Sequence, residues 1–143
     1  MSSASQAGTE TRDNMPSFSQ VSKDRLATCD PRLQKVFNEV VKYFDCFVIQ
    51  GHRGQAEQDR AFAEGKSQLK WPNGNHNSLP SKGIDVIPYP IDWSDRERMT
   101  LFAGFVIGIA QGMNIDIRWG GDWNENTKVK DNSFDDLPHF EVK

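Results

Sequence analysis

The sequence predicts an α+β domain in which helices pack on a small, mainly antiparallel sheet. Helix-like and strand-like patterns follow one another irregularly, no segment repeats at a fixed period, and the short apolar runs end at glycine or proline. At 143 residues the chain is long enough to form one hydrophobic core and too short for two. We therefore expect one folded domain over residues 21–143, preceded by a flexible tail over residues 1–20, which are poor in large apolar groups.

The N-terminal half predicts a helix, a strand and a second helix. Asp30 suits a helix cap, Pro31 suits the first turn, and apolar residues then recur at helical spacing. Residues 45–50 are short, apolar and β-rich, which predicts a buried strand. We expect the second helix from about residue 55 to residue 64, ended by Gly65 in the left-handed conformation.

The C-terminal half predicts a loop, three strands and the longest helix. Residues 66–82 contain prolines, asparagines and glycines without periodicity, as in a loop. Ser94 and Glu97 form a capping-box signature before a helix with one apolar face. The three strands are expected at residues 83–87, 115–119 and 139–142.

The composition excludes several classes of function. The net charge is -3 and no stripe of lysine or arginine occurs, so we expect no nucleic-acid binding. No apolar run approaches the roughly 18 to 20 residues of a membrane span, and the first residues lack the apolar segment of a signal peptide, so we expect no membrane insertion. Cys29 and Cys46 match no metal or nucleophile motif and are expected to be reduced and buried.

Two of the three histidines lie near carboxylates in loop or strand segments. A hydrolytic zinc site takes about three nitrogen or oxygen ligands and keeps one position open for water. His76, Asp85 and His139 can supply such a set. Their spacing also occurs by chance in proteins where the histidine is an ordinary loop residue and the aspartate caps a turn, so spacing alone leaves both interpretations open. His52 is interpreted as a structural histidine, on the strand face opposite to Arg53.

A metal-dependent hydrolase also needs a carboxylate that takes a proton from water and passes it to the leaving group. Asp136 is one candidate, because Leu137 and Pro138 predict a tight turn that brings it close to His139. Glu141 is the other candidate. It shares a strand face with His139, so it can act as the base or fix a ligand in place.

Several ordered motifs resemble a known enzyme family. Gly51-His52-Arg53 with Gln58 resembles the Gly-x-Arg-x4-Gln signature of the zinc D-Ala-D-Ala carboxypeptidases and dipeptidases. Further segments, over about residues 28 to 143, resemble the branch of phage endolysins that are L-alanyl-D-glutamate peptidases. They are residues 76–86, 88–93, 120–123 and 134–141.

The resemblance implies the fold of the zinc D-Ala-D-Ala peptidases, also called the hedgehog/DD-peptidase fold, and a Zn²⁺ cofactor. It implies that His76, Asp85 and His139 bind the zinc and that Asp136 is the general base and acid. Arg53 would stabilise negative charge on the scissile carbonyl oxygen, and Gln58 would orient Arg53 or the substrate, which places both in the substrate site.

We therefore expect a monomeric endolysin that cleaves the L-Ala-D-Glu bond of peptidoglycan stem peptides and stays in the host cytoplasm until lysis. The alternatives are a D-Ala-D-Ala carboxypeptidase or dipeptidase and a non-catalytic cell-wall-binding module. Two residues depart from the family pattern: Gly74 stands where many members have serine, and Gly83 where many have alanine. Neither departure removes a ligand. For each of the four tryptophans packing is the expected role, with the substrate groove as the alternative.

Overall fold

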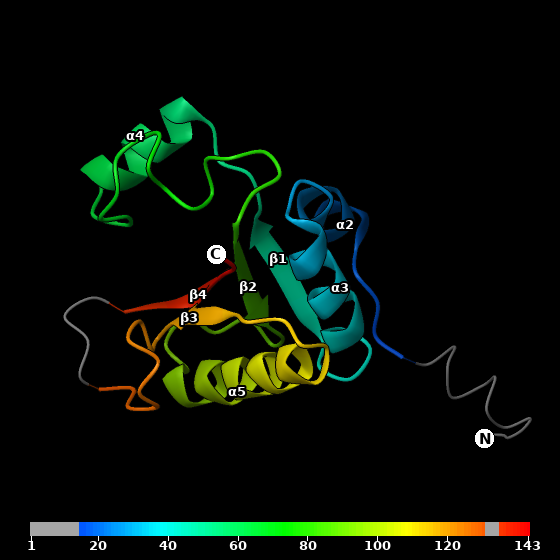
Figure 1. Cartoon of the computed structure of the whole chain (residues 1–143). Helices are drawn as coiled ribbons and strands as arrows, with labels where there is room; N and C mark the ends of the chain where they lie inside the picture. The colour runs from blue at the N-terminus through cyan, green and yellow to red at the C-terminus, as the bar shows by residue number, and fades with distance from the viewer. Residues whose placement is uncertain (1–14, 131–134) are drawn as a thin grey trace, which may run out of the picture.

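The computed structural model describes residues 15–130 and 135–143. Within these residues, four strands form one antiparallel sheet in the order β1-β2-β4-β3 (Figure 1). Their bounds are β1 Cys46–Gln50, β2 Gly83–Pro88, β3 Arg118–Gly120 and β4 Asp136–Glu141. The predicted class, α+β with a small antiparallel sheet, is confirmed.

The helices divide into a packed group and one that lies apart. The packed helices are α2 Gln20–Leu26, α3 Pro31–Val40 and α5 Arg96–Gly112, and they contact the sheet or one another. Helix α4, Gln55–Ala63, projects from the end of the sheet where β1 finishes (Figure 1). The chain between α4 and β2 returns to the same end of the sheet, so this end gathers several loop side chains.

The hydrophobic core lies on one face of β4. Phe140 is completely buried, and its ring contacts Phe37 of α3 and Phe102 of α5 at centroid distances of 5.4 Å and 6.0 Å. Because side chains alternate along a strand, His139 and Glu141 point to the opposite face of β4. Burial of Phe140 therefore fixes the direction of both polar neighbours.

The predicted ends of α3 and α4 are confirmed. The Asp30 side chain accepts a hydrogen bond from the backbone N–H of Arg32, and Pro31 begins α3. Gly65 follows α4 with a φ of 75°. Both cysteines are buried and reduced as expected, and burial raises the pKa of each thiol to about 12.

The start of α5 differs from the prediction. The cap is Asp95, whose carboxylate accepts a hydrogen bond from the backbone N–H of Arg98 at 3.0 Å. The Ser94 hydroxyl instead donates to Asp92 at 2.6 Å. Asp92 therefore draws Ser94 into the preceding turn, and the next acidic residue takes over the cap.

All four strands differ from their predicted bounds, β1 and β2 by a single residue and β3 and β4 by more. Strand β3 begins at Arg118 rather than residue 115, because the backbone N–H of Ile115 still bonds to the carbonyl of Ala110 in α5. Strand β4 begins at Asp136, so the tight turn expected before His139 is wrong. A β-bulge lies there instead. Trp119 and Gly120 are neighbours on β3, but they pair with Phe140 and Asp136 of β4, so the extra residues lie on β4.

The expected tail over residues 1–20 differs from the structure at its C-terminal end. Phe18 belongs to the hydrophobic core, and the Ser19 side chain caps α2. Residues 1–14 lie outside the described residues, so flexibility there stays a prediction. None of the described helices is long and apolar enough to span a membrane.

Candidate active site

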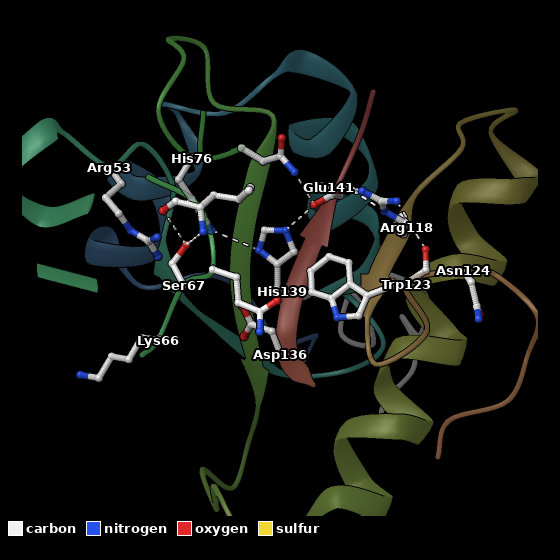
Figure 2. Close-up of a pocket in the computed structure, with 14 residues that line it drawn as sticks. Arg53, Lys66, Ser67, His76, Arg118, Trp123, Asn124, Asp136, His139 and Glu141 are labelled. Carbon is white, nitrogen blue, oxygen red and sulfur yellow. Dashed lines mark hydrogen bonds and ion pairs between the residues drawn. The ribbon is translucent and has the colours of Figure 1, made fainter. Parts of the chain in front are cut away.

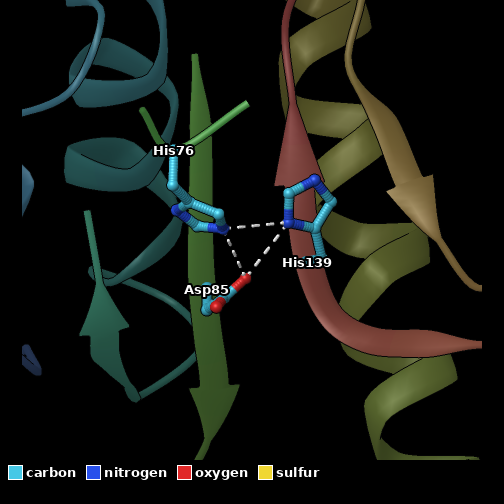
Figure 3. Close-up of side chains that lie close together, drawn as sticks. All are labelled: His76, Asp85 and His139. Carbon is cyan, nitrogen blue, oxygen red and sulfur yellow. Dashed lines mark hydrogen bonds and ion pairs between the residues drawn. The ribbon is translucent and has the colours of Figure 1, made fainter. Parts of the chain in front are cut away.

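Three side chains that are distant in the sequence meet at one point. His76 Nε2, His139 Nδ1 and Asp85 Oδ1 form a triangle in which each pair of atoms is 3.2 Å apart (Figure 3). Both histidines are buried, and the Asp85 side chain is 13% exposed. The residues predicted to form the ligand set are therefore brought together.

The pairing of β2 with β4 places two of these residues. Asp85 of β2 pairs with His139 of β4, and Gly83 pairs with Glu141. Residues two apart on a strand share a face, so these four positions lie on one face of the sheet. His76 arrives from the loop before β2, where the backbone N–H of Arg53 bonds to its carbonyl at 2.7 Å.

The triangle fits a small divalent ion. Ligand atoms about 2.0–2.2 Å from a tetrahedral zinc lie roughly 3.3–3.6 Å from one another. The separations of 3.2 Å match that requirement with little adjustment. Three protein ligands would leave a fourth position open, and two imidazoles with one carboxylate are donors that zinc prefers.

The second nitrogen of each imidazole is already engaged. His76 Nδ1 lies 2.8 Å from the carbonyl oxygen of Gly51, which can only accept a hydrogen bond. His139 Nε2 lies 2.7 Å from Glu141 Oε1. Donation by these two N–H groups leaves the lone pairs of His76 Nε2 and His139 Nδ1 directed into the triangle, as a ligand requires.

The electrostatics of the triangle favour a positive charge. Burial alone would raise the pKa of Asp85, but the charge of His76 and hydrogen bonds with both histidines lower it well below its usual range. Burial alone would lower the pKa of His139, but hydrogen bonds to Asp85 and Glu141 raise it to about 10. The arrangement therefore stabilises a positive charge at the centre of the triangle.

Arg53 borders the triangle and is held in one orientation. Its Nε donates to Gln50 and its Nη1 donates to Gln58, each at 2.9 Å. Its Nη2 lies 3.6 Å from Asp85 Oδ2, the carboxylate oxygen that faces away from the triangle. Two of its nitrogens are thus engaged inside the protein, and Nη2 is the one nearest the site.

Gln58 is completely buried and holds Arg53 from behind. Its Oε1 accepts from Arg53 and from Asn77, and its Nε2 donates to Ser67 and to the Leu69 carbonyl. Gln58 does not line either cavity described below. Of the two roles expected for it, this position favours orienting Arg53 over contact with the substrate.

A cavity of about 440 Å³ opens over the triangle. Arg53 and Trp123 lie on opposite sides of it, with His76, Asp136 and His139 between them (Figure 2). A second cavity of about 740 Å³ adjoins the first and also contacts Arg53 and Asp136. The triangle therefore lies where two hollows meet, as suits an extended substrate.

Two comparisons with known proteins give the family and the fold of this chain. The family described as phage L-alanyl-D-glutamate peptidase matches residues 15–143. This chain belongs to that family. The fold is similar to the crystal structure of the Serratia marcescens L-Ala D-Glu endopeptidase ChiX, with a TM-score of 0.70 and 23% identity over 97% of this chain and 96% of that one.

Family membership confirms the predicted function. The chain is a phage peptidase that hydrolyses the L-Ala-D-Glu bond of peptidoglycan, as its family is described. The alternatives considered from the sequence, D-Ala-D-Ala hydrolysis and wall binding without catalysis, are not supported by this match.

The two carboxylates considered as the base have different surroundings in this peptidase. Burial and the nearby Asp85 carboxylate raise the pKa of Asp136 to about 6, against the opposing charges of His139, His76 and Arg53. Burial would also raise the pKa of Glu141, but hydrogen bonds and charges from His139 and Arg118 lower it to about 2. Near neutral pH, Asp136 is much the better proton acceptor and donor.

Two residues of the site, Arg118 and Asn75, were not found from the sequence, and both bind Glu141. Trp123, for which the sequence left packing and the substrate groove as alternatives, lies against His139 with ring centroids 5.5 Å apart and lines the cavity. The one available signal was the position of Arg118, next to Trp119 in a strand-like segment that alternates apolar and charged residues. His52 is not part of the triangle, as expected; its backbone N–H donates to the Thr28 hydroxyl.

Proposed function

We propose that this peptidase is zinc-dependent and that His76, Asp85 and His139 bind the ion. The observation that carries the proposal is the triangle of ligand atoms, each pair 3.2 Å apart, with both histidine tautomers set by acceptors behind them. When bound, zinc would polarise the scissile carbonyl and lower the pKa of a water molecule to about 7.

Asp136 is the proposed general base and acid. Its carboxylate lines the cavity beside the triangle, and its raised pKa, about 6, suits a group that both gains and loses a proton near neutral pH. It would take a proton from the attacking water as the oxygen bonds to the carbonyl carbon. The same proton then passes to the alanine–glutamate amide nitrogen as the C–N bond breaks.

Arg53 is the proposed partner of the carbonyl oxygen. As water attacks, negative charge develops on this oxygen, and a fixed guanidinium stabilises it without having to reorganise. Hydrogen bonds to Gln50 and Gln58 fix two of the guanidinium nitrogens. Gln58 is thus proposed to act on catalysis through Arg53, as a positioning residue.

The biological setting follows from the family. Release of stem peptides from peptidoglycan weakens the wall, and we propose that this occurs in the host cell at lysis. The monomeric state and the stay in the host cytoplasm until lysis stay predictions.

The test is hydrolysis of purified peptidoglycan before and after chelation. We expect the products to carry new L-alanine C-termini and D-glutamate N-termini by mass spectrometry, chelation to abolish their formation, and added zinc to restore it. Full activity of the thoroughly metal-free protein would contradict the proposal. Release of D-alanine alone would favour the D-Ala-D-Ala alternative.

A further inference from the structure

Behind the triangle, the Glu141 carboxylate receives four hydrogen bonds. Its Oε1 lies 2.7 Å from His139 Nε2 and accepts from Asn75 Nδ2 at 2.5 Å. Its Oε2 accepts from Arg118 Nε at 3.0 Å and from Arg118 Nη2 at 2.5 Å. Glu141 is 3% exposed and lies at the edge of the cavity, which Arg118 and Asn75 also line.

The four bonds connect both histidine-bearing segments to the far strand of the sheet. Glu141 and His139 lie on β4, Arg118 lies on β3, and Asn75 directly precedes His76 in the loop. Figure 2 shows Arg118 and His139 on opposite sides of Glu141. The Glu141 carboxylate therefore contacts His139 directly and, through Asn75, the segment that carries His76.

Gly83 lies directly beside this arrangement and leaves room for it. Gly83 pairs with Glu141 across the sheet. A Cβ atom at this position would lie 3.0 Å from His139 Cε1 and 3.3 Å from the Asn75 side chain. Both distances are shorter than ordinary contacts, so a side chain at this position would require His139 or Asn75 to shift by a few tenths of an ångström.

We propose that Glu141, held by Arg118 and Asn75, is a positioning residue that fixes the ring orientation and tautomer of His139 for metal binding. The inference rests on the proposed zinc site and extends it. A carboxylate that accepts the Nε2–H bond keeps the proton on Nε2, directs the Nδ1 lone pair at the ion, and makes the imidazole a stronger donor.

Arg118 has a separate part in this arrangement. Its two hydrogen bonds occupy Oε2, and its charge compensates a carboxylate that is otherwise costly to bury. The guanidinium also lies over the Trp123 ring, 5.5 Å from its centroid. Trp123 forms a wall of the cavity, so Arg118 is packed against the substrate side of the site.

The test is zinc affinity, measured by competition with a chromophoric chelator, together with the visible absorption spectrum of the Co²⁺ form. In Glu141→Gln one oxygen becomes an NH2 group, which cannot accept from Arg118. We expect zinc to bind roughly ten- to a hundredfold more weakly, as for other partners of ligating histidines, and the cobalt bands to shift. Arg118→Met, which leaves Glu141 and His139 in place, should change both readouts in the same direction by less.

The matched control is Glu39→Gln, the same change at a half-buried glutamate of α3 that pairs with Lys42 at 3.0 Å, far from the triangle in sequence. It should bind zinc as the wild type does. If Glu141→Gln or, should that variant not fold, Arg118→Met keeps wild-type affinity and the wild-type cobalt spectrum while His139→Ala loses binding, the inference is wrong and the zinc site stands. If the wild type binds no zinc, the proposed function fails instead.

Discussion

Strand β4 carries one carboxylate on either side of His139, Asp136 before it and Glu141 after it. The surroundings of these two carboxylates shift their pKa values in opposite directions. At the first end, Asp136 lies in the cavity, and burial with the nearby Asp85 raises its pKa to about 6. At the other end, Glu141 accepts hydrogen bonds from His139 and Arg118, and its pKa falls to about 2. The neighbours of each carboxylate, rather than its residue type, therefore decide which acid can exchange protons and which stays charged.

The largest expected effect is at the Asp136 end. Asp136→Asn removes the group that carries the proton, and we expect kcat to fall by about 10²- to 10⁴-fold. Zinc content should stay at the wild-type level, because Asp136 is not a member of the triangle. Peptidoglycan hydrolysis and metal analysis of the same preparation check both. Retained activity would show that Asp136 is not the general base and acid. Loss of zinc would show that Asp136 supports the structure of the metal site.

A second change sharpens the comparison on the same side. Arg53→Met keeps much of the side-chain volume but removes the donor beside the triangle, and we expect kcat to fall by about 10²- to 10³-fold. Steady-state kinetics on a soluble stem peptide separates this fall from a change in KM. Lys70→Met, which removes a cation that lies over the Phe62 ring, is the matched control. An unchanged kcat in Arg53→Met would show that the carbonyl oxygen is stabilised elsewhere.

How far the sequence anticipated these two ends can be followed residue by residue. His76, Asp85, Asp136 and His139 were predicted because they occur in motifs of fixed spacing. The residues alone could not separate the roles of Asp136 and Glu141, because that depends on which strand lies beside each of them, and the family resemblance was what favoured Asp136. The register of β3 against β4 includes a bulge before His139, and no local pattern indicates it.

The fold was predicted more completely than the contacts of the site. Asp30, Pro31 and Gly65 mark helix ends by their own backbone chemistry, so α3 and α4 were placed nearly correctly. The contacts of Glu141 with Arg118 and Asn75 span 23 and 66 residues of sequence and exist only once the sheet has formed. Such contacts require the tertiary structure, which periodicity and spacing do not supply.

The comparison also predicts opposite effects on stability in the metal-free protein. The raised pKa of Asp136 means that its stabilising contribution is present at low pH and is lost as pH rises through about 6, so Asp136→Asn should stabilise at pH 7. The lowered pKa of Glu141 means that its contribution is present above about 4.5 and is lost as pH falls toward 2, so Glu141→Gln should destabilise at pH 7.

Each change should be on the order of 2 kcal/mol in the free energy of unfolding. Urea denaturation of the chelator-treated proteins at pH 7 and pH 3 measures both. At pH 3 the gain from Asp136→Asn should vanish and the loss from Glu141→Gln should shrink. If both variants shifted stability in the same direction at pH 7, the opposite pKa shifts of Asp136 and Glu141 would be contradicted.

The smallest expected effect is at Gly83. Gly83→Ala adds a methyl group 3.0 Å from His139 Cε1, and the ring must yield by a few tenths of an ångström. We expect zinc affinity to fall, by less than in Glu141→Gln, with little change in the pH dependence of activity. Gly104→Ala is the control, because a Cβ there meets nothing within 4 Å. Wild-type zinc affinity in Gly83→Ala would show that His139 is held less tightly than its contacts indicate.

The proposed zinc site is defined by its three ligands, and X-ray absorption at the zinc edge of the reconstituted protein identifies the ligands of the bound ion. Two imidazoles and a shell of nitrogen and oxygen neighbours at about 2.0–2.2 Å are predicted for the wild type. His76→Ala and His139→Ala should each lose the bound zinc, so the signal of the protein-bound ion disappears in both variants. A wild-type spectrum without imidazole, or one that neither substitution changes, would contradict the proposed site.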